Sequence, residues 1–155
     1  MAEALTAVLD STVLVSAFLT EGGVSAALLR YAREGVFLVF LSEDILSETE
    51  HTLTYSRIRA RYPYTDEDLA DFLNRLRLAA EIIDDLPPLA GVVRDPNDDM
   101  IIAAALGARA AYIVTRDRDL LSLGTYEGIT MLTPEAFIAM VRAQRQGEEE
   151  DSTAS

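Results

Sequence analysis

The sequence predicts an α/β sandwich built around a mostly parallel sheet. Short apolar runs alternate with helical patterns along the whole chain, which is typical of this fold class. Acidic residues stand directly after several of these runs, where strands of a parallel sheet would end. Half of the 155 residues are hydrophobic and a quarter are charged, as in ordinary globular proteins. The chain therefore has the length and composition of one domain with a sizeable core.

The apolar runs are the expected strands. Each is short, each contains β-branched or other large apolar side chains, and most are bounded by turn or capping residues. Buried strands of parallel sheets have this continuous apolar character rather than strict alternation. The five expected strands span residues 5–9, 36–41, 80–83, 111–115 and 129–132.

The segments between these runs repeat apolar residues at helical spacing and begin at capping residues. Gly35, Gly107 and Gly124 supply stops. Pro96 suits a first helical position, with Asp95 as the cap before it. The expected helices are a buried one over 13–19, one over 24–34, one after Ser42, one after Thr65, one beginning at Pro96, one turn over 120–123 and a last one after Thr133.

Residues 1–145 are expected to form the domain, and residues 146–155 a disordered acidic tail without hydrophobic periodicity. No apolar run approaches the length of a membrane span. The N-terminus lacks the basic start and cleavage site of a signal peptide. The chain contains no Cys, which excludes disulfides and thiolate chemistry. These features predict a cytoplasmic protein that does not contact membranes.

Charge excludes several functions. The formal net charge is −13, and removing the four carboxylates of residues 148–151 leaves −9. Such a surface opposes non-specific binding of nucleic acids. All 13 basic residues are Arg, so a P-loop, which needs Lys, is excluded. Receiver domains and haloacid-dehalogenase phosphatases also normally use a Lys. The first strand is followed by Asp10 to Val13 rather than by the G-x-G-x-x-G of a dinucleotide-binding fold.

Three carboxylates stand where a parallel sheet would present the carboxyl ends of its strands or the helix start beside them. Asp10 follows the first strand, Asp98 opens a helix, and Asp117 follows the fourth strand, with Asp119 close behind. Each has a structural alternative. Asp98 could complement a helix N-terminus, Asp117 could cap a helix, and Asp10 could begin a turn. Spacing alone predicts that Asp98, Asp117 and Asp119 lie near one another.

Taken jointly, these carboxylates predict a metal site, because capping does not require Asp at several strand ends of one crevice. Closely packed like charges repel one another unless a cation neutralises them. With no Cys and His51 as the single His, a zinc site is disfavoured. Oxygen ligands favour Mg²⁺ or Mn²⁺, ions that suit phosphodiester hydrolysis.

The helix after Ser42 offers two further acidic candidates. Glu48 and Glu50 lie on opposite flanks of its apolar stripe. Both lie beyond the first turn, so compensation of the helix dipole explains neither. Periodicity does not choose between them.

Four segments carry these acidic residues in order, between Leu5 and Met140: LDSTVLVSAFL, LSEDILSETEHTL, RDPNDDMIIAAAL and YIVTRDRDLL. Together they resemble the motifs of the PIN-domain family of metal-dependent ribonucleases, and most closely its toxins of toxin–antitoxin systems. The resemblance implies a three-layer α/β/α sandwich with a mostly parallel sheet of about five strands. It also implies RNA as substrate, a homodimer, and inhibition by an antitoxin segment.

The resemblance assigns roles to residues. It makes Asp10, Asp98 and Asp117 metal ligands and, with Glu48, the catalytic set; the alignment prefers Glu48 to Glu50. Its auxiliary positions are Thr12, Asp99, Thr115 and Asp119.

Two positions depart from the family pattern. Thr12 stands where Asn is usual, and it can still hydrogen-bond to a carboxylate. Arg116 stands where Gly is usual, and it could contact substrate or partly neutralise the site.

Further substrate contacts are expected from a cluster of arginines and tyrosines. Arg57, Arg59 and Arg61 could bind phosphates, while Tyr55, Tyr62 and Tyr64 stack on bases. The same cluster could equally be a solvated or partner-binding surface. Two hypotheses follow: a Mg²⁺- or Mn²⁺-dependent endoribonuclease, or a PIN-like module that binds nucleic acid or protein with little or no cleavage.

Overall fold

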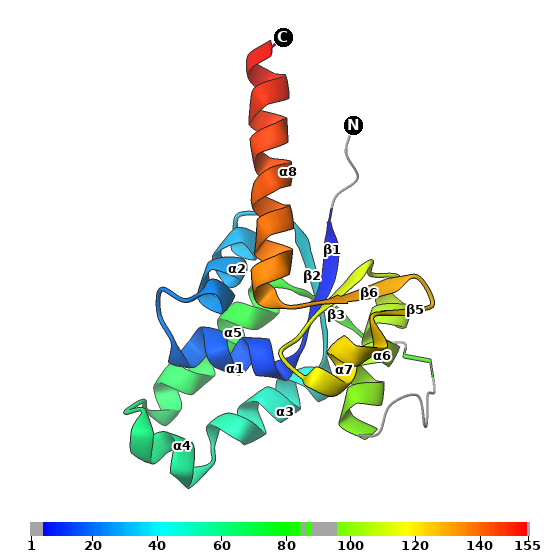
Figure 1. Ribbon diagram of the computed structural model, residues 1–155. Helices are drawn as coiled ribbons and strands as arrows, with labels where there is room; N and C mark the ends of the chain where they lie inside the picture. Colours follow the sequence, from blue (N-terminus) through cyan, green and yellow to red (C-terminus); the bar gives the residue numbers. More distant parts are fainter. Residues whose placement is uncertain (1–4, 85, 88–95, 155) are drawn as a thin grey trace.

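The computed structural model describes residues 5–84, 86–87 and 96–154, which form one sheet surrounded by helices (Figure 1). The expected cap Asp95 lies outside the described residues. The six strands are β1 (Thr6–Leu9), β2 (Leu38–Ser42), β3 (Glu81–Ile83), β4 (Tyr112–Val114), β5 (Thr125–Tyr126) and β6 (Ile129–Leu132).

The sheet has the strand order β3-β2-β1-β4-β6-β5. All neighbouring strands are parallel except β5, which pairs antiparallel with β6. The prediction of a mostly parallel sheet is therefore confirmed, but the sheet has six strands rather than five. The additional strand β5 is two residues long, too short to show a pattern in the sequence.

A tight turn explains why β5 forms. Glu127 and Gly128 connect β5 to β6, and both have positive φ, 50° and 82°. Two residues with positive φ are what a type I′ turn requires, and its twist matches that of the strands it joins. Tyr126 consequently pairs with Ile129 and closes a hairpin at the edge of the sheet.

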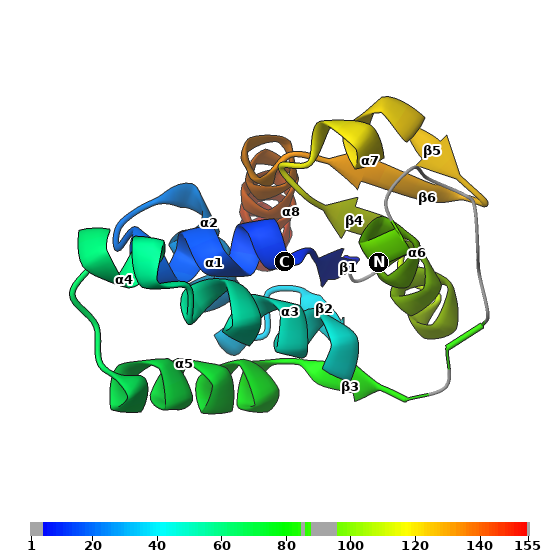
Figure 2. The same ribbon diagram turned by 90° about the horizontal axis from the view of Figure 1, so that it is seen from below.

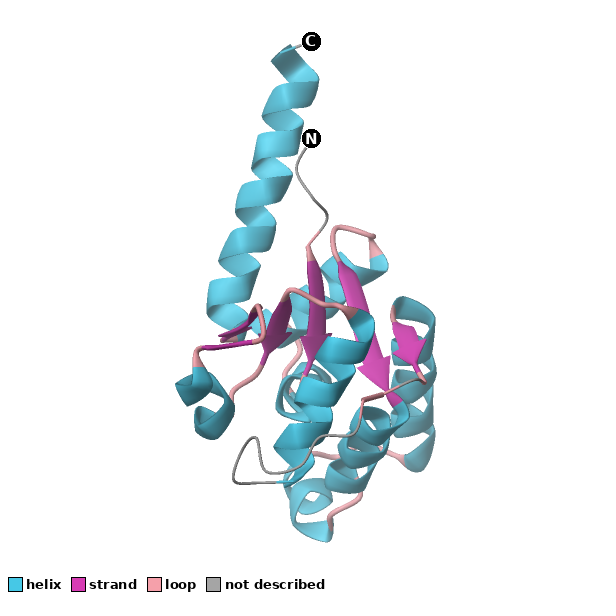
Figure 3. Cartoon of the chain, turned by 90° about the vertical axis from the view of Figure 1, so that its right-hand side faces the viewer, coloured by secondary structure: helices cyan, strands magenta, loops and turns pink. Residues whose placement is uncertain are grey.

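The helices make the outer two layers. α6 lies on one face of the sheet, and α1, α2 and α8 lie on the other (Figures 2 and 3). This arrangement is the three-layer α/β/α sandwich that was predicted. The helices are α1 (Ser11–Leu19), α2 (Val24–Arg33), α3 (Glu43–Leu53), α4 (Ser56–Arg61), α5 (Asp66–Ala79), α6 (Pro96–Ala108), α7 (Arg118–Leu123) and α8 (Pro134–Ala154).

Two capping residues begin their helices as the sequence indicates. The hydroxyl of Ser42 accepts a hydrogen bond from the amide of Ile45 at 3.2 Å. Thr65 and Asp68 form a reciprocal capping box at the start of α5. Ser42 also ends β2, so α3, the helix that carries Glu48, begins directly at the carboxyl edge of the sheet.

The core lies where β1 and β4 meet α6. Val8, Leu9, Ile113 and Val114 are fully buried in the two central strands. On α6 the buried residues are mostly small or β-branched, so this helix can lie close against the sheet: Ile101, Ile102, Ala103, Ala104 and Ala105. Full burial of each large side chain stabilises the fold by about 1.5–3 kcal/mol. The residues that follow β1 and β4 are therefore attached to two strands that tight packing holds in place.

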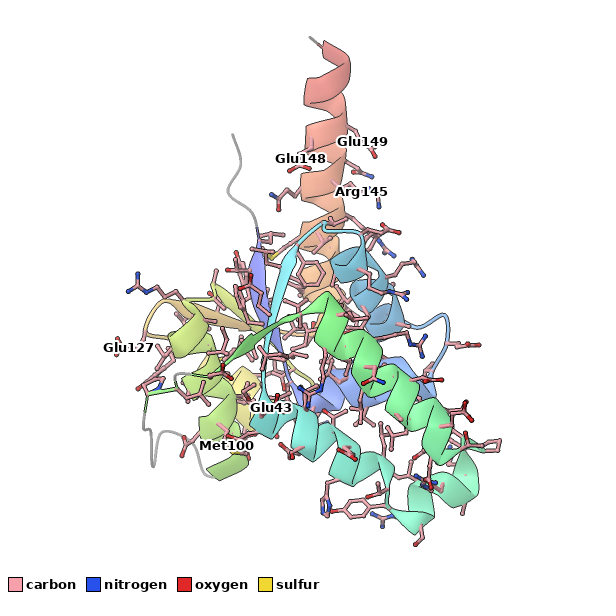
Figure 4. The ribbon with its side chains drawn as sticks, turned by 180° about the vertical axis from the view of Figure 1, so that it is seen from behind. Glu43, Met100, Glu127, Arg145, Glu148 and Glu149 are labelled. Carbon is pink, nitrogen blue, oxygen red and sulfur yellow. The ribbon has the colours of Figure 1, made fainter. Side chains whose placement is uncertain are left out.

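Helix α8 projects beyond the rest of the fold, at the end of the molecule opposite the carboxyl ends of the strands (Figure 1). Arg145, Glu148 and Glu149 lie on this projecting part (Figure 4). The backbone is helical through Ala154, whereas composition predicts disorder from residue 146. An ion pair between Arg145 and Glu149, one turn apart at 3.7 Å, accompanies this helix. The boundary of the domain at residue 145 stays a prediction.

Within the described ranges, no single helix is both long and apolar enough to cross a membrane. Helices α1 and α2 together have sufficient length and apolar composition, but they are bent by 100° relative to each other.

Candidate active site

The site begins at the carboxyl ends of the two central strands. Leu9 of β1 pairs with Val114 of β4, and the amide of Asp10 donates a hydrogen bond to the carbonyl of Val114 at 3.0 Å. The chain leaves β1 towards β2 on one side of the sheet, while β4 lies on the other. This is the switch point at which open α/β sheets form their ligand crevices. Figure 2 looks onto this edge of the sheet.

Asp10 is held inside this edge by hydroxyl groups. Its side chain is 4% exposed, and its Oδ2 accepts hydrogen bonds from Thr115 at 2.6 Å and from Thr12 at 3.0 Å. Burial raises the pKa of Asp10 above its usual 3.8; the two hydroxyls oppose this shift, and the charge of Asp117 adds to it. Asp10 makes no side-chain cap to α1, so a capping role does not explain its position.

The same two hydroxyls tie the loop after β4 to Asp10. Thr115 Oγ1 accepts a hydrogen bond from the amide of Asp117 at 2.9 Å. Thr12 Oγ1 accepts one from the amide of Arg116 at 3.2 Å. Each hydroxyl thus donates to the carboxylate and accepts from the loop, which uses both of its capacities. Thr12 therefore provides the hydrogen bond expected of it in place of Asn.

Three carboxylates converge beside Asp10. Oxygen atoms of Asp98, Asp117 and Asp119 lie within 4.8 Å of one another, although the side chains range from buried to exposed. The sequence spacing predicted that these three residues lie together. Asp10 is not a member of this group of three, and Asp119, expected as auxiliary, is. Asp117 also caps α7, because its Oδ1 accepts from the amide of Asp119 at 2.8 Å.

The structure separates the two glutamates of α3. Glu50 is exposed and lines a groove between α3 and α5 that Arg77 shares. Glu48 is half-buried and lies on the flank of α3 away from that groove. His51 is exposed and packs edge-on against Tyr55, with ring centroids 5.0 Å apart, so it belongs to the surface.

Asp99 is buried in the first turn of α6, next to Asp98. Acidic residues at this position are stabilised by the positive end of the helix dipole. The N-terminus of α6 therefore supports two buried carboxylates at the same edge of the sheet.

The family model of the PIN domain matches residues 6–119. The chain belongs to the PIN-domain family. This PIN domain also resembles a solved structure, VapBC2 from Rickettsia felis bound to a DNA fragment from their promoter, with a TM-score of 0.57 and 14% sequence identity. The likeness covers 83% of this chain and 98% of the other and shows a shared fold. No curated protein matches the sequence.

The arginines expected to bind substrate are placed unequally in this PIN domain. Arg59 forms an ion pair with Asp66 and lies over the ring of Tyr64 at 5.3 Å, and Arg61 lies over Tyr62 at 5.7 Å. Arg57 is exposed on α4. These side chains line α4 and the loop after it, rather than the edge that carries the carboxylates.

A groove of about 570 Å³ lies between α1, α2 and α5. Its lining mixes the apolar Phe18, Leu29 and Phe72 with Arg33 and Arg75. None of the carboxylates of the site lines this groove. This groove and the acidic cluster are therefore different features of this PIN domain.

Proposed function

We propose that this PIN domain is a Mg²⁺- or Mn²⁺-dependent endoribonuclease that hydrolyses phosphodiester bonds of RNA. The observation that carries the proposal is the convergence of Asp98, Asp117 and Asp119 within 4.8 Å, beside the buried Asp10. Carboxylates of like charge repel one another at such distances. A hard divalent cation removes this repulsion, so the geometry fits a metal centre better than three helix caps.

The donor set fits the proposed metal. Every side chain in the group offers carboxylate oxygen, the ligand type that Mg²⁺ and Mn²⁺ prefer. Asp98 and Asp117 are metal ligands in this proposal, with Asp10 beside them and Asp119 as a further ligand. A bound ion would activate water and stabilise the leaving oxygen of the phosphodiester.

The remaining residues orient these ligands. Thr115 and Thr12 hold Asp10 through hydrogen bonds and prevent its carboxylate from rotating. Asp99 supports the same edge from α6. Glu48, which the resemblance to PIN ribonucleases selects and which is half-buried, would orient the attacking water, whereas Glu50 lines the groove that Arg77 shares.

The physiological role that we infer is that of a toxin. Resemblance to PIN-family toxins and the likeness to VapBC2 both support a cognate antitoxin as partner. The proposal also includes a cytoplasmic location and a homodimer, which light scattering on the purified chain would test. Arg57, Arg59 and Arg61 would contact RNA phosphates outside the catalytic crevice.

Cleavage of matched RNA and DNA oligonucleotides tests the enzymatic proposal. We expect Mn²⁺ or Mg²⁺ to support internal cleavage of RNA, chelator to stop it, and Asp98→Asn to lower its rate by at least about 100-fold. Glu43→Gln, a change on the exposed surface, is the matched control and should cleave normally. Binding of RNA without metal-dependent cleavage would instead identify a binding module.

A further inference from the structure

Arg116 directly precedes Asp117 and borders the group of carboxylates that we call the acidic crevice: Asp10, Asp98, Asp117 and Asp119. Its backbone lies between Thr115 and Asp117, and its amide donates to Thr12, which in turn donates to Asp10. Its side chain is 42% exposed. The backbone of Arg116 is therefore held by hydrogen bonds of the site, whereas its side chain extends into solvent.

Glu135 holds the guanidinium of Arg116 in place. The two groups form a pair of hydrogen bonds, at 2.9 Å from Nη2 to Oε1 and at 3.4 Å from Nη1 to Oε2. Glu135 lies in the first turn of α8, where the helix dipole favours a carboxylate. Arg116, followed by a backbone hydrogen bond, lowers the pKa of Glu135, so the carboxylate remains charged at neutral pH.

Stability is a poor explanation for this ion pair. Both side chains are about half exposed, and exposed pairs contribute about 0–1 kcal/mol. A two-pronged contact instead restricts the orientation of a guanidinium. Arg116 offers five N–H donors, and Glu135 engages two of them. Three N–H donors of Arg116 therefore remain for another partner.

We propose that Glu135 is a positioning residue, which orients Arg116 so that its remaining N–H groups bind a backbone phosphate of the RNA strand at the crevice. This inference rests on the proposed nuclease function and deepens it. In an acidic protein, RNA cannot approach through general positive charge. An oriented guanidinium at the rim supplies the local positive charge that the approach requires.

The direction in which Glu135→Gln changes RNA affinity distinguishes a positioning role from a purely electrostatic one. Removing a negative charge near a nucleic-acid site should strengthen RNA binding, because repulsion of phosphates decreases. If Glu135 orients Arg116, Glu135→Gln should weaken binding instead. Glu34→Gln is the matched control: Glu34 also pairs with an arginine of α8, Arg145, at 3.6 Å and with similar exposure, and Arg145 lies on the projecting part of α8 (Figure 4).

The experiment is single-turnover cleavage of a single-stranded RNA oligonucleotide in Mn²⁺, with enzyme concentration varied. It yields a half-saturating concentration and a maximum rate for the wild type and for Arg116→Gln, Glu135→Gln, the double variant and Glu34→Gln. We expect Arg116→Gln to raise the half-saturating concentration about tenfold, the loss of a charge-assisted contact of about 1.4 kcal/mol. Glu135→Gln should raise it several-fold, and maximum rates should change less than about twofold.

Two further results are expected. In the Arg116→Gln background, Glu135→Gln should have no additional effect, because the residue it orients is gone. Arg116→Gln should also reduce the salt dependence of binding by about one phosphate contact, a slope change of about 0.7 for single strands.

Three outcomes would overturn the proposal. Glu135→Gln could strengthen RNA binding, its effect could persist without Arg116, or all variants could match the wild type. In each of these cases a cleaving wild type leaves the nuclease function intact. A wild type that neither binds nor cleaves RNA would remove both proposals together.

Discussion

The crevice at the strand ends and the surface of α4 use charge in opposite ways. In the crevice, carboxylates of one sign gather around Asp10, which is 4% exposed. On α4, each of two arginines has a neutralising or aromatic partner nearby: Arg59 lies beside Asp66 and Tyr64, and Arg61 lies over Tyr62. In the function that we propose, the first region binds a cation from outside the chain, whereas the two arginines of the second region have partners within the chain.

This difference predicts where the fold would be under electrostatic strain in the absence of metal. Local pairing on α4 contributes little and costs little, as expected for exposed groups. The crevice places like charges beside buried strands, and if it binds a metal as we propose, we expect repulsion among these carboxylates to oppose folding in the absence of a cation. Functional sites commonly carry such a cost, so a variant that relieves it should be more stable and less active.

The largest expected effect lies within the crevice and separates Glu48 from Glu50. Glu48→Gln should lower RNA cleavage by about 100-fold or more, as loss of a group that orients the attacking water does. Glu50→Gln should retain most activity, because Glu50 lines the groove with Arg77. Cleavage rates of the two variants under identical Mn²⁺ conditions check this. An inactive Glu50 variant beside an active Glu48 variant would reverse the assignment.

Metal binding provides the next largest effect. Asp98→Asn should weaken Mn²⁺ binding by at least about tenfold, because the group loses one of its three carboxylates. Calorimetric titration or paramagnetic broadening measures the affinity. Asp66→Asn on the α4 side removes the same charge from the protein and should leave the affinity unchanged. Equal affinities in wild type and Asp98→Asn would place the metal elsewhere.

Much of this site could be predicted from local sequence. Asp98, Asp117 and Asp119 lie within one helix–strand–helix segment, whose patterns place them at one edge. The partner of Arg116 could not be predicted, because Glu135 is 19 residues away and its approach depends on how α8 packs. Only the fold shows that Glu50 and Arg77 line one groove between α3 and α5.

The sequence did not predict strand β5 or helix α4, because both lack a pattern of buried apolar residues. β5 is defined by two residues and a turn at Glu127 and Gly128, so its pairing rather than its composition reveals it. Helix α4 carries no buried residue, and for that reason it shows no apolar stripe in the sequence. Long buried strands and capped amphipathic helices, by contrast, are visible from residue patterns alone.

A smaller effect concerns stability in the absence of metal. Asp10→Asn should raise the unfolding free energy by about 0.5–2 kcal/mol at neutral pH, in chelator, while lowering cleavage. Folding raises the pKa of the Asp10 carboxyl above 3.8. Protonation of this carboxyl therefore stabilises the folded protein, and the stabilisation is fully present below about pH 3.8. It is lost as the pH rises through the pKa of the folded state. The advantage of Asn should therefore shrink towards acid. Denaturant unfolding of both proteins across this pH range measures it.

The matched control for that experiment is a carboxylate with a capping role. Asp68→Asn weakens the capping box of α5 and removes a negative charge from the N-terminus of that helix, so it should destabilise by about 0.3–1 kcal/mol. If Asp10→Asn destabilises as Asp68→Asn does at every pH and cleavage persists, the crevice is structural rather than catalytic.

The smallest effects are expected on α4 and at the first residue of α5, Asp66, which pairs with Arg59 of α4. Asp66 is 89% exposed, so Asp66→Asn should lower the unfolding free energy by less than about 1 kcal/mol and leave cleavage unchanged. Arg57→Gln should raise the half-saturating RNA concentration by about threefold or less, since an exposed charge contact contributes at most about 1 kcal/mol. The salt dependence of RNA binding decides whether that loss is a phosphate contact. An Arg57 variant that binds RNA like the wild type at every salt concentration would make α4 a solvated or partner-binding surface. A loss as large as that of Arg116→Gln would instead extend the substrate path from the crevice to α4, and the two regions would then share one function.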